Sequence, residues 1–193
     1  MTAKGYLAIS ILLLFPIYMF SCSPKQFSVT IPNDFQMVAT RKEDKIPLRA
    51  GLILKPEYQK LIAPKLSFEN QTVHMGGAFF AGCERMLGNI FQDVIVIDQE
   101  GKYGVDVIVT PEITKWEKGM RLSSENTFPI WMDIRWKILS PAGKLIYLNT
   151  VKSEIWPKIS RGLAGGETRR GELMAAYLMS LNDQLLRAQE DIS

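Results

Sequence analysis

The segment FPIWMDIRWKIL, residues 128–139, constrains the fold of this chain more than any other. Every second residue from Phe128 to Ile138 is apolar, and the charged residues Asp133, Arg135 and Lys137 lie between them. This period of two predicts a strand with one face on a core and the other in water. A turn at 140–143 and a second strand at 144–155 would complete a hairpin.

Four further segments have the apolar content of strands, namely 47–55, 65–73, 94–98 and 105–116. In the last of these, Pro111 predicts an edge position or a bulge, because proline cannot donate to a ladder.

Two segments have the period of amphipathic helices, at about 75–93 and about 168–190. The first carries apolar residues at Phe79, Phe80, Cys83, Met86, Leu87, Ile90, Phe91 and Val94. Cys83 lies on this stripe, which favours a buried structural thiol over a reactive one. Together the patterns predict an α+β fold, an antiparallel sheet with a long hairpin packed against two amphipathic helices.

The first 21 residues have the pattern of a secretory signal peptide. A positive start at Lys4 precedes an apolar run from Tyr6 to Phe20, which Pro16 interrupts. A membrane span needs about 20 apolar residues, so cleavage is favoured over an uncleaved anchor helix, which stays an alternative.

Met19-Phe20-Ser21-Cys22 resembles the lipobox of bacterial lipoproteins. The resemblance implies that diacylglycerol is attached to Cys22, that the chain is cleaved before it, and that the new amino terminus is acylated. Ser23 then implies sorting to the periplasmic face of the outer membrane, with inner-membrane anchoring as the alternative. Residues 22–46 are predicted to be the lipidated N-terminus and a flexible tether, and 47–193 a single periplasmic domain.

Composition argues against several function classes. The 23 Lys and Arg residues balance 20 Asp and Glu without a basic block, which does not favour nucleic-acid binding. One histidine and two cysteines provide no zinc spacing. The glycine-rich segment 160–171 lacks the P-loop and Rossmann patterns, and no nucleophile motif occurs. We therefore predict no catalytic residue, no metal and no cofactor, with an envelope hydrolase as the alternative.

Two segments are the candidates for binding a partner. The segment 117–127 exceeds the length that a hairpin needs, although a tolerated insertion would look the same. The segment 160–170 joins a strand to a helix. Tryptophan and arginine dominate many interfaces, and the candidate residues are Trp116, Arg121, Ser124, Trp131, Arg161, Arg169 and Arg170.

The order of these parts resembles the YajG-like lipoproteins and the auxiliary envelope lipoproteins. The resemblance covers about residues 47–190, from the strand AGLIL through the helix FFAGCERMLGNIFQDV and the strand VDVIVTPEI to the C-terminal helix. It implies a non-enzymatic, lipid-anchored module that binds an envelope protein in assembly or transport, and it transfers no functional residue.

Overall fold

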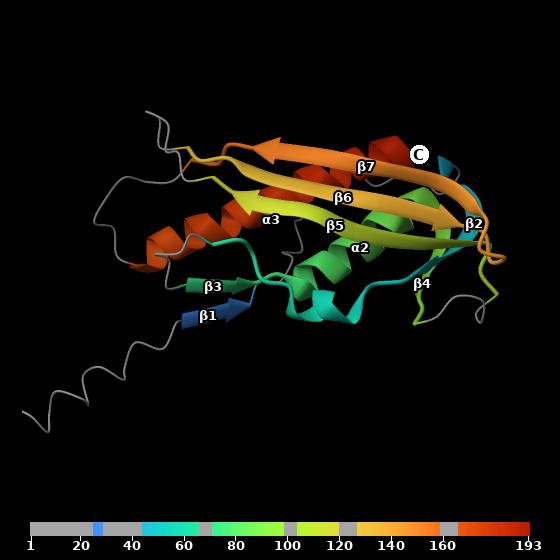
Figure 1. Ribbon diagram of the computed structural model, residues 1–193, viewed down its shortest axis with the longest axis horizontal. Helices are drawn as coiled ribbons and strands as arrows, with labels where there is room; N and C mark the ends of the chain where they lie inside the picture. Colours follow the sequence, from blue (N-terminus) through green and yellow to red (C-terminus); the bar gives the residue numbers. More distant parts are fainter. Residues whose placement is uncertain (1–24, 29–43, 66–70, 99–103, 120–126, 159–165) are drawn as a thin grey trace, which may run out of the picture.

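The computed structural model describes residues 25–28, 44–65, 71–98, 104–119, 127–158 and 166–193. In this part of the chain, a five-stranded sheet carries two long helices on one face (Figure 1). The elements are, in chain order, β1 (Lys25–Ser28), β2 (Ile46–Leu52), the 3-10 helix η2 (Pro56–Lys60), β3 (Gln71–His74), α2 (Gly76–Ile90), β4 (Phe91–Val96), β5 (Val107–Lys118), β6 (Ile130–Leu139), β7 (Leu145–Ile155) and α3 (Gly166–Ile192).

The predicted α+β class is confirmed, and the sheet has the order β4-β2-β5-β6-β7. The antiparallel strands β5, β6 and β7 form its larger part, and β6 and β7 are the predicted hairpin. The expectation of an antiparallel sheet is wrong for β2, which runs parallel to both β4 and β5. The sheet is therefore mixed, because α2 carries the chain back so that β4 starts at the same end as β2.

The alternation that we predicted for β6 is confirmed. Ile130, Met132, Ile134 and Trp136 have no exposed surface, whereas Arg135 and Lys137 between them are exposed. The turn after β6 closes with a hydrogen bond of 2.9 Å from the Gly143 N–H to the Ser140 carbonyl. Gly143 has φ 78°, a backbone conformation that suits glycine.

Pro111 lies in β5 just beyond the residues that pair with β2, where no other described strand lies beside that edge of β5. The Ile53 N–H donates to the Val109 carbonyl at 2.9 Å, and Pro111 follows on the same edge, beyond the end of β2. Its missing N–H therefore removes no ladder bond. On this edge the Ile113 N–H donates to the Tyr58 hydroxyl of η2 at 3.0 Å. The bulge of β5 lies further along, between Ile113 and Lys115, so of the two predicted positions for Pro111 the structure has the local edge and not the bulge.

The helix predicted at 75–93 ends at Ile90, three residues early. Phe91 has an extended backbone, φ −102° and ψ 152°, and begins β4, so the strand predicted at 94–98 lies at Phe91–Val96. The error arose because Phe91 fits both the helical stripe and a strand, and it is buried in either case. Cys83 is fully buried as predicted, and burial raises the pKa of its thiol well above the ordinary value.

A two-stranded parallel ribbon joins β1 to β3, with Lys25 opposite Gln71 and Ser28 opposite His74. β3 is the last part of the strand predicted at 65–73, of which 66–70 lie outside the described residues. β1 falls inside the segment that we predicted to be a tether. The ribbon lies toward the end of the molecule opposite the β6–β7 turn (Figure 1).

The last helix is longer than predicted by two residues at each end. No helix among the described residues is long and apolar enough to cross a membrane.

Candidate interaction surface

The structure places only some of the predicted site residues. Trp116 and Trp131 lie in β5 and β6, and Arg169 and Arg170 belong to the first turns of α3. The candidates Cys22, Arg121, Ser124 and Arg161 lie outside the described residues. The partner-binding role of all of them, and lipidation of Cys22, stay predictions.

Trp116 faces the helices. Its ring makes an edge-to-face contact with Tyr177 of α3, with 6.0 Å between centroids. It reaches this face because of the bulge after Ile113, which shifts the alternation of β5 by one residue and sets Trp116 opposite Met132. The indole N–H is buried and has no hydrogen-bond partner among the described residues.

Trp131 faces the other way, onto the open side of the sheet. Its neighbours across the ladder are Glu117 and Glu154, and the Lys115 ammonium lies 5.0 Å from the centroid of its ring. Adjacent core residues of β6 point toward the helices, so their neighbour Trp131 cannot. The two tryptophans therefore do not share one contact patch.

The middle of the open face carries an ion-pair network. The Lys55 ammonium lies 2.9 Å from a carboxylate oxygen of Glu112, and Arg135 lies 3.4 Å from the other oxygen. The hydrogen bond from Lys55 is the main cause that lowers the pKa of Glu112, and the same bond raises the pKa of Lys55. Such exposed pairs contribute little to stability. Among the described residues no cluster of three or more His, Cys, Asp or Glu side chains could hold a metal ion.

An apolar row crosses the open face at one end of the sheet. It runs through all five strands in register, as Ile95, Gly51, Ile108, Leu139 and Leu145. Ile97 and Val105 cover its middle; a Cβ on Gly51 would lie 2.6 Å from Ile97, which explains the glycine. At β7 the row is uncovered, and Leu145 is 50% exposed.

The start of β7 thus forms an exposed apolar cluster, Leu145, Ile146 and Leu148, with 50%, 56% and 54% of their surfaces exposed. These are three of the seven large apolar side chains that are exposed among the described residues, and they lie within four positions of the chain. Sequence reasoning missed them. The available signal was the run LIYL, in which strict alternation fails.

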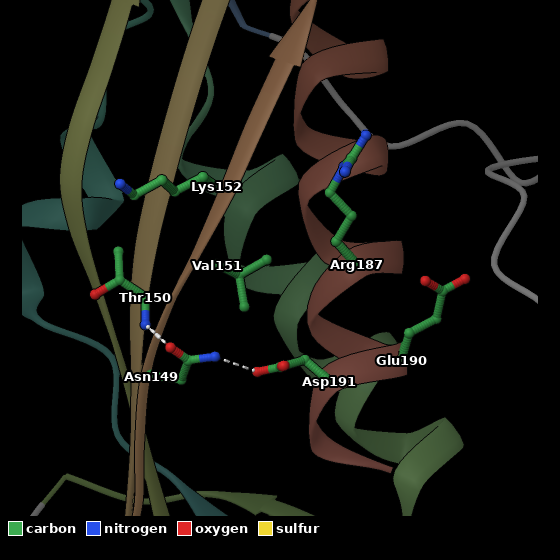
Figure 2. Close-up of a pocket in the computed structure, with 7 residues that line it drawn as sticks. All are labelled: Asn149, Thr150, Val151, Lys152, Arg187, Glu190 and Asp191. Carbon is green, nitrogen blue, oxygen red and sulfur yellow. Dashed lines mark hydrogen bonds between the residues drawn. The ribbon is translucent and has the colours of Figure 1, made fainter.

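A groove of about 450 Å³ lies beside the same strand, between β7 and α3 (Figure 2). Its lining residues are Asn149, Thr150, Val151, Lys152, Arg187, Glu190 and Asp191. In Figure 2, Val151 and Asn149 point toward α3, whereas Thr150 and Lys152 point away from it. Val151 and Asn149 therefore line the part of the groove next to α3, whereas Thr150 and Lys152 line the part on the side of β7 away from the helix.

Polar contacts hold α3 against β7 along this groove. Asp191 accepts hydrogen bonds from the Tyr147 hydroxyl and, at 2.9 Å, from the Asn149 amide. Asp183 accepts from the Ser153 hydroxyl at 2.6 Å and from Arg187 at 2.7 Å. Burial, with the Asp191 bond second, raises the pKa of Tyr147 to about 12. These contacts hold α3 beside β7, and among the described residues no strand pairs with the other edge of β7.

No family model matches the chain. No curated protein matches it either. Similarity appears at the level of structure: a Xanthomonas campestris protein of family DUF330 superposes with a TM-score of 0.55 at 8% identity, covering 86% of this chain and 92% of that one. The two share a fold. An identity this low shows the fold alone.

Two other solved structures are described as lipoproteins. A minor lipoprotein from Acinetobacter baumannii has a TM-score of 0.48 and 9% identity, covering 77% of this chain and 92% of its own. Lipoprotein B from Nitrosomonas europaea, described as uncharacterised, has a TM-score of 0.45 and 12% identity, covering 81% and 86%. The structural neighbours thus include bacterial lipoproteins, while the finer resemblance to YajG-like lipoproteins stays a prediction.

Proposed function

We propose that this protein is a lipid-anchored, non-enzymatic binding module that faces the periplasm from the outer membrane and docks a protein partner in envelope assembly or transport. The observation that carries the binding role is the exposed apolar cluster Leu145, Ile146 and Leu148. Exposed apolar side chains gathered in one place mark contact sites more often than scattered ones do.

The position of β1 supports anchoring through Cys22. Lys25 is three residues after Cys22, and such a stretch spans at most about 10 Å. Because β1 is paired to β3, a lipid on Cys22 would hold the ribbon end of the body at the membrane surface. The opposite end, with the β6–β7 turn, would then point into the periplasm (Figure 1).

The thiol of Cys83 is not available as a nucleophile. Cys83 is fully buried, and its raised pKa keeps the thiol protonated and unreactive at neutral pH. The bacterial lipoproteins among the structural neighbours are consistent with a module of this kind.

Lipid attachment is tested by labelling cells with a fatty-acid probe. The wild type and the matched control Cys83→Ala should take up the probe, and Cys22→Ser should not. Equal labelling of Cys22→Ser would exclude this anchor.

Partner binding is tested by crosslinking in living cells. A photoreactive residue is placed at Leu148, at Ser124 or at Arg169, with the exposed α3 residue Met179 as the control position. At least one of the three positions should trap a defined envelope protein that Met179 does not. If no position does so and the purified protein hydrolyses cell wall or lipid, the hydrolase alternative replaces the module.

A further inference from the structure

Among the described residues no strand pairs with the outer edge of β7, so this edge carries backbone hydrogen-bonding groups without a strand partner there. β7 is the last strand of the sheet, and α3 packs beneath it. The Thr150 N–H donates to the Asn149 side-chain oxygen at 2.8 Å, which places this N–H on the outer edge, away from β6. Backbone direction alternates along a strand. The N–H and carbonyl groups of Leu148, Lys152 and Glu154 therefore face the same open edge.

The register of the neighbouring strands agrees with this assignment. Lys152 lies opposite Asp133, and the Asp133 carbonyl accepts from the Thr114 hydroxyl of β5 at 3.2 Å. Asp133 thus directs its backbone toward β5, as a residue in a non-hydrogen-bonded pair with β7 must. The β6–β7 register shifts only at Leu139, so the alternation holds from Tyr147 to Ile155.

The side chains near this edge indicate what kind of segment could bind there. Residues 137–148 include Lys137 and Lys144 and no acidic residue, and both lysines are exposed. Lys144 directly precedes the apolar cluster in the chain, and Lys137 lies opposite Leu148 in the β6–β7 ladder. A complementary segment would carry both apolar side chains, for the cluster, and carboxylates, for the lysines, in the row of alternate residues that faces the open side of the sheet.

The groove beside α3 has room for the second row of side chains. A strand added to the edge would direct alternate residues toward the open face and toward the groove lined by Val151 and Glu190. α3 would flank the added strand without blocking it, because its polar contacts hold it under β7.

We propose that β7 binds an extended segment of a partner protein as a sixth strand, and that the row of this segment on the open face of the sheet combines apolar and acidic side chains. The inference deepens the proposed function, since it names how and with what chemistry the module binds. A protein segment is favoured over a lipid surface because the β6–β7 turn lies at the end opposite β1, where the proposed anchor is (Figure 1).

The test isolates one backbone hydrogen bond. Cells make the full-length protein with a photoreactive residue at Leu148, alone or combined with Lys152→Ala or Lys152→Pro. Alanine removes the side chain and keeps the edge-facing N–H, whereas proline removes both and is tolerated on edge strands. Crosslink yield should fall about three- to tenfold further for Lys152→Pro than for Lys152→Ala. Mass spectrometry of the crosslinked peptide should show apolar and acidic side chains among residues two positions apart.

Each other outcome overturns the proposal. Equal yields from Lys152→Ala and Lys152→Pro would exclude backbone pairing. Crosslinks to a second copy of this chain would make β7 a self-pairing edge, and crosslinks to lipid alone would make it a membrane contact. Thermal unfolding of the purified variants verifies folding. If Lys152→Pro does not fold, Lys144→Glu decides, because an unchanged yield would contradict an acidic partner.

The two proposals fail in different ways. Crosslinks from Ser124 or Arg169 with none from Leu148 would keep the binding module and remove the β7 site. If the wild type takes up no fatty-acid probe, the lipid anchor is excluded, but the comparison of Lys152→Ala with Lys152→Pro still tests the β7 site.

Discussion

The helices α2 and α3 cover the same face of the sheet and pack against each other, yet they bury different chemistry. The buried residues of α2 are all apolar or glycine, namely Gly76, Ala78, Phe79, Gly82, Cys83, Met86, Leu87 and Ile90. α3 buries Ser180 and Gln184 completely, beside apolar residues such as Leu181 and Leu185.

The polar groups of α3 are incompletely satisfied. The Gln184 amide donates to the Val151 carbonyl at 3.1 Å, but its oxygen and the Ser180 hydroxyl have no hydrogen-bond partner among the described residues. A buried polar atom without a partner costs about 1–3 kcal/mol. We infer that, of the two helices, α3 is held less stably against the sheet and opens at lower free energy than α2. This difference matters because α3 is one wall of the β7 groove.

The largest effect is expected in α2. Phe79 is fully buried and meets Tyr58 edge-to-face, with 5.2 Å between ring centroids. Phe79→Ala should lower the free energy of unfolding by about 3–5 kcal/mol in urea titration. The exposed control Met179→Ala in α3 should change it by less than about 0.5 kcal/mol. A loss below about 2 kcal/mol for Phe79→Ala would contradict the inference that α2 is the more stable of the two helices.

Two adjacent glycines test how closely α2 approaches η2. A Cβ on Gly76 would lie 2.3 Å from the Gln59 carbonyl oxygen, whereas a Cβ on Gly77 would meet nothing within 4 Å. Gly76→Ala should destabilise by about 3 kcal/mol, because backbone must move. Gly77→Ala should be neutral or stabilise by about 0.5–1 kcal/mol, measured by the same titration. Equal changes in the free energy of unfolding for the two variants would show that η2 moves away from a Cβ at position 76 without a loss of stability.

A reciprocal exchange of polarity compares the two helices directly. Ala78 in α2 and Ser180 in α3 both have almost no exposed surface. Ala78→Ser should destabilise by about 1–3 kcal/mol, because it buries a hydroxyl. Ser180→Ala should be neutral or stabilise by up to about 1 kcal/mol, because it removes a buried hydroxyl that has no hydrogen-bond partner among the described residues. A clear loss of stability for Ser180→Ala would mean that its hydroxyl is satisfied in solution.

The smallest effect concerns the bond between β7 and the end of α3. The pKa of Tyr147 is raised from 10.0 to about 12 in the folded protein. Its contribution to stability is therefore complete below pH 10 and is lost as pH rises through about 12, because the unfolded state releases the proton first. Tyr147→Phe should lack this loss, with a difference of about 1 kcal/mol after solvent screening. If the free energy of unfolding falls equally with rising pH in the wild type and in Tyr147→Phe, the Tyr147 hydroxyl does not contribute this stability.

Much of the fold could be predicted because its patterns are local. The alternation of β6 and the stripe of α2 each depend on residues within a few positions, and the structure confirms the buried faces of both. The end of α2 could not be read, because Phe91 satisfies the helical and the extended pattern equally well. The faces of the predicted site residues Trp116 and Trp131 could not be predicted, because the bulge of β5 places the two side chains on opposite sides of the sheet.

Residue type and short spacing were enough to predict the long helices, the hairpin strands and the burial of Cys83, and they give the lipobox-like pattern at Cys22, whereas β1 and η2 were not predicted. Only the folded structure shows that β2 lies between β4 and β5, that β1 pairs with β3, and that no strand among the described residues pairs with the outer edge of β7. Strand pairing joins segments far apart in the chain, and any two apolar strands offer the same backbone groups. Which pairs form, and which edge is left open, follows from how the whole chain packs.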